Sequence, residues 1–385
     1  MATILIWMSP EAGHTIPSIK IASDLRQRNH KVVYLTCGKI CQELASLGFD
    51  TRTFLPSDWR ELAARRIFGR CRPALQMYGA LERRFHGRQE FRAAIRDEIQ
   101  RAAIAIGADL VVVDGVHDTW LKMYRVMQNH CRVARLYVHL PYKPLPVEDV
   151  HAELSPRIYL SPKQFELPEY ICESAHYTEP ALYVGPYSST DSFDWSTLNP
   201  DVPLVYCSLG SQMVLYSGTE PFLRHMLAAA AALPGYQFVI NAGPLIERLV
   251  ASPEVNNVAH NVSLVPFVPH PEVLSKATVA IVHGGFGVIK ECIWFGVPML
   301  IVPHKWDQPL NAVRVAYHGL GFHLDVDKMS DKLVAEAVRV LATNASIKNR
   351  LQQMREVFLA SENHHETARI CSEFLQTRLS SLPAL

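Results

Sequence analysis

A glycine-rich turn in the C-terminal half of the chain carries the residue types expected at a phosphate site. The stretch Ile281–Asn311 predicts a strand ending at Val282, a turn His283-Gly284-Gly285, a helix over about 286–295 and a second strand over 297–302. Two glycines let backbone N–H groups approach a ligand, and the helix N-terminus behind them carries roughly +0.5 charge, which suits phosphate. The spacing fits neither the P-loop nor the dinucleotide-binding fingerprint.

Further polar residues flank this turn. Glu291 lies two turns along the predicted helix, and Asp307-Gln308 follow the second strand. A carboxylate beside an amide offers both acceptors and donors to neighbouring hydroxyl groups. With His283, these residues could hold a phosphate and two hydroxylated rings. The alternatives are an ordinary turn histidine, a solvated helix carboxylate and a polar loop.

A second set of residues in the N-terminal half suits proton transfer. His14 closes the turn Glu11–His14 after the first predicted strand, and Asp114 directly follows a buried strand over Ala108–Val113. Both lie at carboxyl ends of parallel strands, where side chains from different strands can meet. A carboxylate on one imidazole nitrogen fixes the tautomer and leaves the other nitrogen to accept a hydroxyl proton. Asp118 is the alternative partner, and a loop histidine beside a surface carboxylate is the alternative to a catalytic pair.

The elements that must position these residues follow a strand–helix–strand pattern. Strands are expected over Thr3–Met8 and Lys31–Thr36, with a helix between them that has Pro17 in its first turn. Further strands are expected over 133–139 and 157–160. This opening predicts an α/β fold with a doubly wound parallel sheet.

The pattern begins again after a segment rich in Pro, Ser, Asp and Thr over 183–203. Leu204–Ser208 predicts a strand, followed by a glycine turn and a helix, and strands over 236–241 and 262–268 continue the sheet. We therefore expect an N-terminal domain over 1–190, a linker over 191–203 and a C-terminal domain over 204–385. The tail over 345–379 is expected to be helical and could pack back on the N-terminal domain.

Composition excludes several classes of protein. A length of 385 residues favours about two domains, and a formal net charge of +1 predicts no general attraction to nucleic acid. No apolar run approaches the ~18 residues of a membrane span, and the apolar start is too short for a signal peptide. The eight cysteines are scattered, without a C-x-x-C pair, which indicates reduced thiols and a cytoplasmic location.

Residues 60–101 carry an excess of positive charge. Eleven arginines stand there against five acidic residues. Solvated helices explain this composition, while a cover over the pocket of an anionic acceptor and contact with an anionic membrane surface are the alternatives.

Four segments of the chain resemble one known family, the UDP-glycosyltransferase superfamily, and within it the bacterial natural-product and antibiotic members. They are GHTIPSIKIASDLRQRNHKVVYLT at 13–36, VYCSLGS at 205–211, FVPHPEVL at 267–274, and the block from HGGFGVIKE at 283 through WDQPLN at 311. The resemblance covers nearly the whole length. It implies the GT-B fold, in which two Rossmann-like doubly wound domains face each other across a cleft that holds a nucleotide sugar.

The resemblance also implies roles for individual residues. His14 matches the general base of the family and Asp114 its partner, in a domain that binds the acceptor. The C-terminal domain would bind the donor. Its nucleobase would lie between Phe267 and Val268, and its ribose at Glu291. The diphosphate would lie at Ser211, His283 and the turn residues that follow His283, and the sugar at Asp307 and Gln308. The turn residues meant are Gly285, Phe286 and Gly287.

Three features depart from the pattern of the family. Gly287-Val288 follows Phe286, where members similar to this chain often carry Asn-Ser or Gly-Thr, so a hydroxyl contact to phosphate is missing. Phe267 replaces the tryptophan, and His270 the glutamine, that plant members carry. Both UDP- and dTDP-linked sugars therefore stay open as donors.

The resulting expectation is an inverting, metal-independent hexosyltransferase without a cofactor, which transfers a sugar from a nucleotide sugar to a hydroxyl of a small, largely apolar acceptor. The alternatives are a nucleotide-sugar epimerase of the same fold and a catalytically degenerate auxiliary partner of another glycosyltransferase. The expected partners are the two substrates, with no nucleic acid and no integral membrane span. The sequence leaves the oligomeric state, the acceptor and the sugar open.

Overall fold

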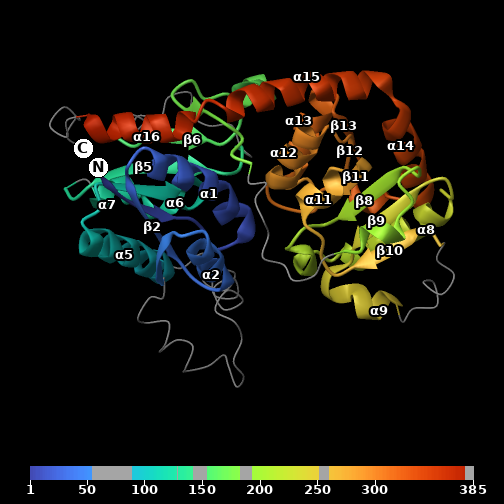
Figure 1. The fold of residues 1–385 in the computed structure, drawn as a ribbon, viewed down its shortest axis with the longest axis horizontal. Helices are drawn as coiled ribbons and strands as arrows, with labels where there is room; N and C mark the ends of the chain where they lie inside the picture. Colours follow the sequence, from blue (N-terminus) through green and yellow to red (C-terminus); the bar gives the residue numbers. More distant parts are fainter. Residues whose placement is uncertain (54–88, 128, 142–153, 183–192, 251–259, 378–385) are drawn as a thin grey trace.

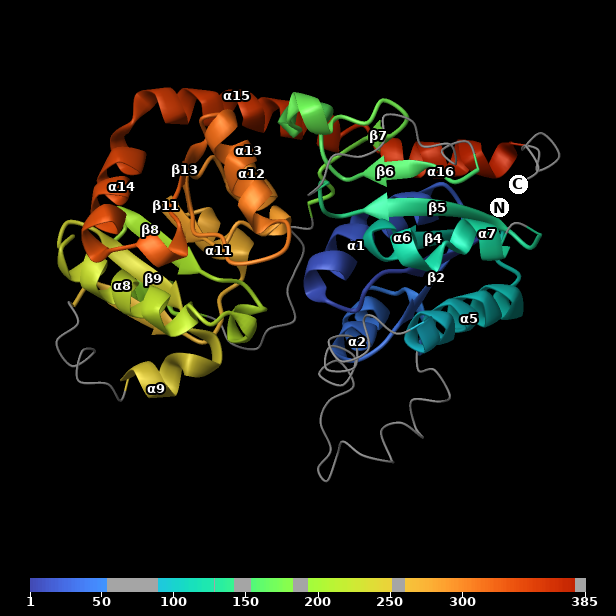
Figure 2. The ribbon, with the colours of Figure 1, turned by 180° about the vertical axis from the view of Figure 1, so that it is seen from behind.

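The computed structural model describes residues 1–53, 89–127, 129–141, 154–182, 193–250 and 260–377. These residues form two parallel sheets that lie side by side, each covered by helices (Figures 1 and 2). Most of the arginine-rich segment over 60–101 lies outside the described residues.

The first sheet has seven strands in the order β3-β2-β1-β4-β5-β6-β7, all parallel. Its strands are β1 Thr3–Trp7, β2 Lys31–Thr36, β3 Asp50–Thr53, β4 Leu110–Asp114, β5 Arg132–Tyr137, β6 Arg157–Tyr159 and β7 His176–Tyr177. The helices of this half are α1 Ala12–Gln27, α2 Lys39–Ser46, α5 Gln89–Ile106, α6 Gly115–Leu121 and α7 Met123–Met127. The central strands are continuous apolar runs because helices cover both faces of the sheet.

The second sheet has six parallel strands in the order β10-β9-β8-β11-β12-β13. Its strands are β8 Leu204–Ser208, β9 Gln237–Asn241, β10 Val262–Val265, β11 Ala277–Val282, β12 Met299–Ile301 and β13 Gly321–His323. Its helices are α8 Thr219–Ala231, α9 Ile246–Val250, α11 His270–Leu274, α12 Phe286–Phe295, α13 Gln308–Tyr317 and α14 Asp331–Thr343.

Prolines shorten two of the predicted strands. The strand expected over 262–268 ends at Val265, directly before Pro266, and the strand expected over 297–302 begins at Met299, directly after Pro298. Proline has no backbone N–H to donate to a sheet, so it lies at the strand ends. The helix over 286–295 has the predicted bounds and ends at Gly296, whose φ of 73° is left-handed.

The order of strands reverses direction once in each sheet, between β1 and β4 in the first and between β8 and β11 in the second. Loops that leave the carboxyl ends of strands on the two sides of such a point diverge, and they leave a crevice in which ligands bind. His14, Asp114, Ser211 and His283 lie at or just after the ends of these four strands, whereas Phe267 and Val268 follow β10, and Asp307 and Gln308 follow β12.

The C-terminal tail is two helices rather than one. The tail is helical as predicted, in α15, Ala345–Glu362, and α16, Glu366–Gln376, with a break at residues 363–365, where His365 takes a left-handed φ of 50°. The break allows α15 to pack on the second domain and α16 on α1 of the first (Figure 1). Phe358 of α15 lies in the core of one half and Ile370 of α16 in the core of the other.

Two buried cations join the domains. Arg314 of α13 is fully buried; its Nε donates to Oε1 of Glu166 over 2.7 Å, and its Nη2 donates to Oε2 of Glu166 over 3.1 Å and to the Pro141 carbonyl over 2.6 Å. Lys290 of α12 donates to the carbonyl of Pro180 over 2.6 Å. Burial lowers the pKa of Lys290 to about 8. The phenyl rings of Phe165 and Phe286 stack beside these contacts, 5.6 Å apart, so the interface is apolar around its charges.

None of the helices in the described part of the chain combines the length and the apolar character needed to cross a membrane.

We expect Glu166→Ala to lower the free energy of unfolding by about 3–5 kcal/mol, because it leaves the Arg314 guanidinium buried without its counter-charge. The matched control is Glu173→Ala, which removes an ion pair with Lys163 whose two side chains are 73% and 45% exposed. That change should cost less than about 1 kcal/mol. Chemical denaturation followed by fluorescence measures both, and equal losses would contradict a special role for the buried pair.

Candidate active site

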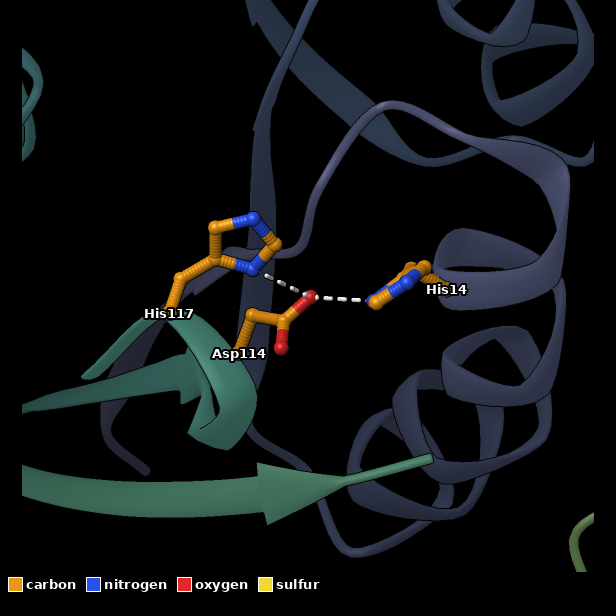
Figure 3. A group of neighbouring side chains, drawn as sticks. All are labelled: His14, Asp114 and His117. Carbon is orange, nitrogen blue, oxygen red and sulfur yellow. Dashed lines mark hydrogen bonds and ion pairs between the residues drawn. The ribbon is translucent and has the colours of Figure 1, made fainter. Parts of the chain in front are cut away.

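The predicted pair His14 and Asp114 meets at the carboxyl ends of β1 and β4. His14 lies in the first turn of α1, and Asp114 is the residue before α6, whose Val116 N–H donates to its Oδ1 over 3.1 Å. Nδ1 of His14 lies 2.6 Å from Oδ2 of Asp114, although 100 residues separate them (Figure 3). The alternative partner, Asp118, instead accepts a hydrogen bond from the backbone of Met123.

Asp114 is held as a carboxylate. Burial favours its neutral form, but His14 and His117 outweigh that effect and hold the pKa of Asp114 well below its ordinary value. Oδ2 also accepts from the Ser9 backbone N–H over 3.1 Å. Because an ionised carboxylate only accepts hydrogen bonds, Nδ1 of His14 must carry the proton between them. Nε2 is therefore the nitrogen of His14 that can act as a base.

His117 was not among the predicted residues. Its Nδ1 lies 3.4 Å from Oδ2 of Asp114, so two imidazoles flank one carboxylate oxygen (Figure 3). His14, Asp114 and His117 are close enough to be considered as metal ligands. Two ligands on a tetrahedral zinc ion with bonds of ~2.0 Å lie roughly 3.3 Å apart. The 2.6 Å between His14 and Asp114 is instead the length of a charge-assisted hydrogen bond, so this arrangement suits proton chemistry.

In the second domain, the ring of His283 lies between two glycine turns. A Cβ at Gly210 would come within 2.6 Å of the ring, and a Cβ at Gly285 within 2.5 Å of its Nε2. Gly210 also has a left-handed φ of 73°. Burial, helped by His270, lowers the pKa of His283 to about 4. At neutral pH this histidine therefore meets a ligand as a hydrogen-bonding group without charge.

The predicted phosphate turn offers mainly backbone groups. Gly285 precedes α12 and no side chain caps the helix, so its first N–H groups have no side-chain partner there. Phe286 and Val288 are buried in the core, so their side chains face away from the turn. Gly287 is half-buried, and Ser211 is exposed on the loop after β8. This arrangement suits an anion held by amides and a hydroxyl.

The predicted nucleoside residues divide into exposed and buried groups. Phe267 is 41% exposed, whereas the side chain of Val268 is fully buried, so Val268 offers only its backbone. Glu291 accepts a 2.7 Å hydrogen bond from Nδ1 of His270. Burial opposes the charge on His270, but the Glu291 carboxylate outweighs it and raises the pKa of His270. A ribose hydroxyl at Glu291 would share the carboxylate with this imidazole.

Asp307 and Gln308 are both buried, with different surroundings. The oxygen of the Gln308 amide accepts from the backbone of His304 and Lys305, and its nitrogen donates to the Tyr216 hydroxyl. In this structure Gln308 therefore shapes the loop before α13, and the bonds to His304, Lys305 and Tyr216 leave one N–H of its amide for a ligand. Oδ2 of Asp307 accepts a hydrogen bond from Nδ2 of Asn311 over 2.8 Å, and the same oxygen lies 3.1 Å from Nδ1 of His139 in the first domain.

His139 connects the two halves of the site and was missed as a functional residue. Its Nε2 lies 3.0 Å from Nε2 of His14, and its Nδ1 lies 3.1 Å from Oδ2 of Asp307. It follows β5, the neighbour of β4, at the same edge of the sheet as Asp114. A histidine at the carboxyl end of a predicted parallel strand was the signal that could have found it.

Comparison with known proteins agrees with this architecture. Residues 246–374 match the family model described as Erythromycin biosynthesis protein CIII-like, C-terminal domain. The uncharacterized UDP-glucosyltransferase YdhE of Bacillus subtilis is 26% identical over 216 residues, 54% of this chain and 51% of that protein. The NDP-glycosyltransferase YjiC of the same organism is 27% identical over 202 residues, 52% of this chain and 48% of that protein. The chain thus spans about half the length of these relatives.

Solved structures match over nearly the whole chain. The glycosyltransferase of kitacinnamycin aligns with a TM-score of 0.74 and 21% identity, over 97% of this chain and 99% of that one. The glycosyltransferase VinC in complex with dTDP aligns with a TM-score of 0.71 and 18% identity, over 96% and 100%. This chain has the GT-B fold. The predicted fold class is confirmed, and so is the resemblance of this GT-B chain to bacterial natural-product glycosyltransferases.

In this GT-B chain the ring of His283 is held between two glycine turns, and alanine substitutions can test whether its position matters for ligand binding. We expect Gly285→Ala to displace the imidazole ring and to reduce the thermal stabilisation by nucleoside diphosphates, because the new Cβ lies 2.5 Å from Nε2. The matched variant Gly287→Ala meets nothing within 4 Å. It should keep the ligand-induced shift and stabilise α12 by about 0.5–1 kcal/mol. A Gly285→Ala protein with an unchanged shift would show that the ring position does not matter.

Proposed function

We propose that this GT-B protein is an inverting, metal-independent hexosyltransferase that moves a sugar from a nucleoside diphosphate sugar to a hydroxyl group of a small, largely apolar acceptor. One observation carries the proposal: the His14–Asp114 pair of the first domain lies within two hydrogen bonds of Asp307, which belongs to the second. A base and a sugar contact at that distance suit transfer between two substrates bound on opposite sides.

The donor is assigned to the second domain. The turn before α12, the exposed Ser211 and the uncharged His283 suit a diphosphate, and the Glu291–His270 pair suits the hydroxyls of a pentose. The match of residues 246–374 to the EryCIII-like domain supports this assignment. Relatives named for UDP-glucose and a structural neighbour with bound dTDP keep both donor classes in the proposal.

The mechanism follows from the protonation of the pair. Nε2 of His14 accepts the hydroxyl proton of the acceptor while the oxygen attacks the anomeric carbon from the face opposite the diphosphate. Asp114 stabilises the imidazolium that forms, because its carboxylate is buried 2.6 Å from Nδ1. The diphosphate leaves toward the amides before α12, where the helix dipole favours the negative charge that develops.

The acceptor is assigned to the first domain, near His14. The segments expected to build its pocket, near residues 55–100 and 140–180, lie partly outside the described residues. The eight scattered cysteines support a cytoplasmic location.

Two other functions fit the same fold. A nucleotide-sugar epimerase would use the donor site without an acceptor. A degenerate auxiliary partner of another glycosyltransferase would bind nucleotide without turnover, and the missing hydroxyl at Gly287-Val288 favours it. The hydrogen bond between His14 and the buried Asp114 favours a transferase over an auxiliary protein. A protein that does not use His14 as a base has no use for a buried carboxylate that orients it.

We expect UDP-glucose or dTDP-glucose to raise the melting temperature more than GDP-mannose, since binding to the folded state stabilises it by mass action. A thermal-shift screen measures this without an acceptor. The preferred donor, incubated with a panel of phenolic and polyketide alcohols, should give acceptor-dependent release of nucleoside diphosphate. Release or isomerisation that is independent of every acceptor would favour the epimerase, and binding without any turnover would favour the auxiliary partner.

We expect His14→Ala to lower turnover by a factor on the order of 10² to 10⁴, because it removes the group that takes the proton. Affinity for the nucleoside diphosphate should stay the same, since the donor contacts lie in the other domain. Steady-state kinetics and calorimetry measure the two quantities. Turnover close to that of the wild type would refute His14 as the base.

A further inference from the structure

His139 occupies the atoms that both substrates need. Nε2 of His14 is the nitrogen expected to accept the acceptor proton, and Nε2 of His139 lies 3.0 Å from it. The Asp307 carboxylate is expected to accept a sugar hydroxyl, and Nδ1 of His139 lies 3.1 Å from its Oδ2. The rings of the two histidines meet edge to face, with centroids 4.5 Å apart.

The number of protons on His14 and His139 follows from the two carboxylates, Asp114 and Asp307, to which they are hydrogen-bonded. Asp114 and Asp307 accept hydrogen bonds as carboxylates, so Nδ1 of His14 and Nδ1 of His139 each donate a proton. The hydrogen bond between the two Nε2 atoms holds one more. Three protons on four ring nitrogens give the histidine pair one positive charge, placed between two negative carboxylates.

The carboxylates stabilise this charge. Burial disfavours an imidazolium at His139, but Asp307 outweighs that effect and raises the pKa of His139. Burial likewise disfavours the charge on Asp307, yet His139 outweighs it and lowers the pKa of Asp307. The other charged groups near His139 are Asp114, which favours its charge, and Lys290 of α12, which opposes it.

The surroundings of His14 add one further carboxylate. Oε2 of Glu11 lies 3.9 Å from Nε2 of His14, beyond hydrogen-bond distance. Oε1 of the same side chain accepts from Gln212 of the second domain over 3.4 Å. His139 therefore remains the hydrogen-bond partner of Nε2 among the described residues.

We propose that His139 is a positioning residue that masks the base: in the empty protein it ties Nε2 of His14 to Asp307, and a donor sugar frees His14 by replacing His139 at Asp307. This inference rests on the proposed function. It assigns an order, in which the donor binds first and the acceptor meets an active base only afterwards.

The release step balances in protons. When a sugar hydroxyl takes the carboxylate of Asp307, the imidazolium loses its strongest partner and the proton between the two Nε2 atoms passes to solvent. His14 then keeps its proton on Nδ1 and offers a free lone pair on Nε2. A nucleoside diphosphate without a sugar does not reach Asp307, so it leaves the proton in place.

The first test uses the protein without ligand. In long-range ¹H–¹⁵N spectra of protein labelled at histidine, we expect His139→Ala to move the Nε2 resonance of His14 toward that of an unprotonated, unshared nitrogen. The matched control is His30→Gln, since His30 bonds to Ser372 far from the site. Identical His14 resonances in His139→Ala and wild type would overturn the shared proton.

The second test measures proton release by calorimetry in buffers of different ionisation enthalpy. At pH 7, UDP-glucose should release more protons than UDP, by up to about one per site, and dTDP-glucose more than dTDP. The difference should vanish in His139→Ala and in His139→Gln, because glutamine can bond to Asp307 but carries no titrating proton. Equal release by sugar nucleotide and free nucleotide in the wild type would overturn the release step.

The variants also separate masking from a structural role. With His14 unmasked, His139→Ala should hydrolyse the donor without acceptor at least several-fold faster, relative to transfer, than the wild type does. A loss of hydrolysis and transfer in equal proportion would show that His139 only supports the fold. If the wild type binds none of these nucleotides, the proposed function fails together with the release step, while the ligand-free spectra still decide whether the proton is shared.

Discussion

The buried ion pair between Arg314 and Glu166 fixes where the two domains meet. Taking both charges out of water costs several kcal/mol, and only a bidentate geometry with further hydrogen bonds offsets that cost. Arg314 has these bonds, to Glu166, Asn311 and the Pro141 carbonyl. A rotation of one domain against the other would break several of them at once. Asn311 also holds Asp307, so the side chain that orients the domain contact is one bond away from the expected sugar site.

Each half of the site arises from the same constraint on parallel sheets. Between β1 and β4, and between β8 and β11, neighbouring loops diverge and leave backbone and side chains free to meet a ligand. At the first crevice lie groups suited to acid–base chemistry, His14, Asp114 and His117. At the second lie glycines and a helix N-terminus, which suit an anion. Each half holds only one of these two kinds of group. His139 connects them, because it lies within hydrogen-bond distance of His14 in the first domain and of Asp307 in the second.

Local signals in the sequence predict much of the fold and part of the candidate site. Contacts between residues that are distant in the sequence could not be predicted. The helix over 286–295 and its glycine stop follow from periodicity and capping, and the meeting of His14 with Asp114 follows from sheet geometry. The break at His365 could not be predicted, because it depends on α15 and α16 packing on different domains. The engagement of Gln308 with Tyr216 was equally inaccessible, since those residues are 92 positions apart. Whether a polar residue near a ligand site is free or already bonded depends on such distant partners.

The chain passes between the domains twice, once between β7 and β8 and again between α15 and α16 (Figure 2). A body held by a single connection can turn about any axis, whereas one held at two points turns most easily about the line that joins them. Any motion of one domain against the other is thereby limited to a rotation with one preferred axis, and it would also have to break the bonds of Arg314. Two connections return the domains to the same relative position, which is what the 3.1 Å hydrogen bond between His139 of one domain and Asp307 of the other requires.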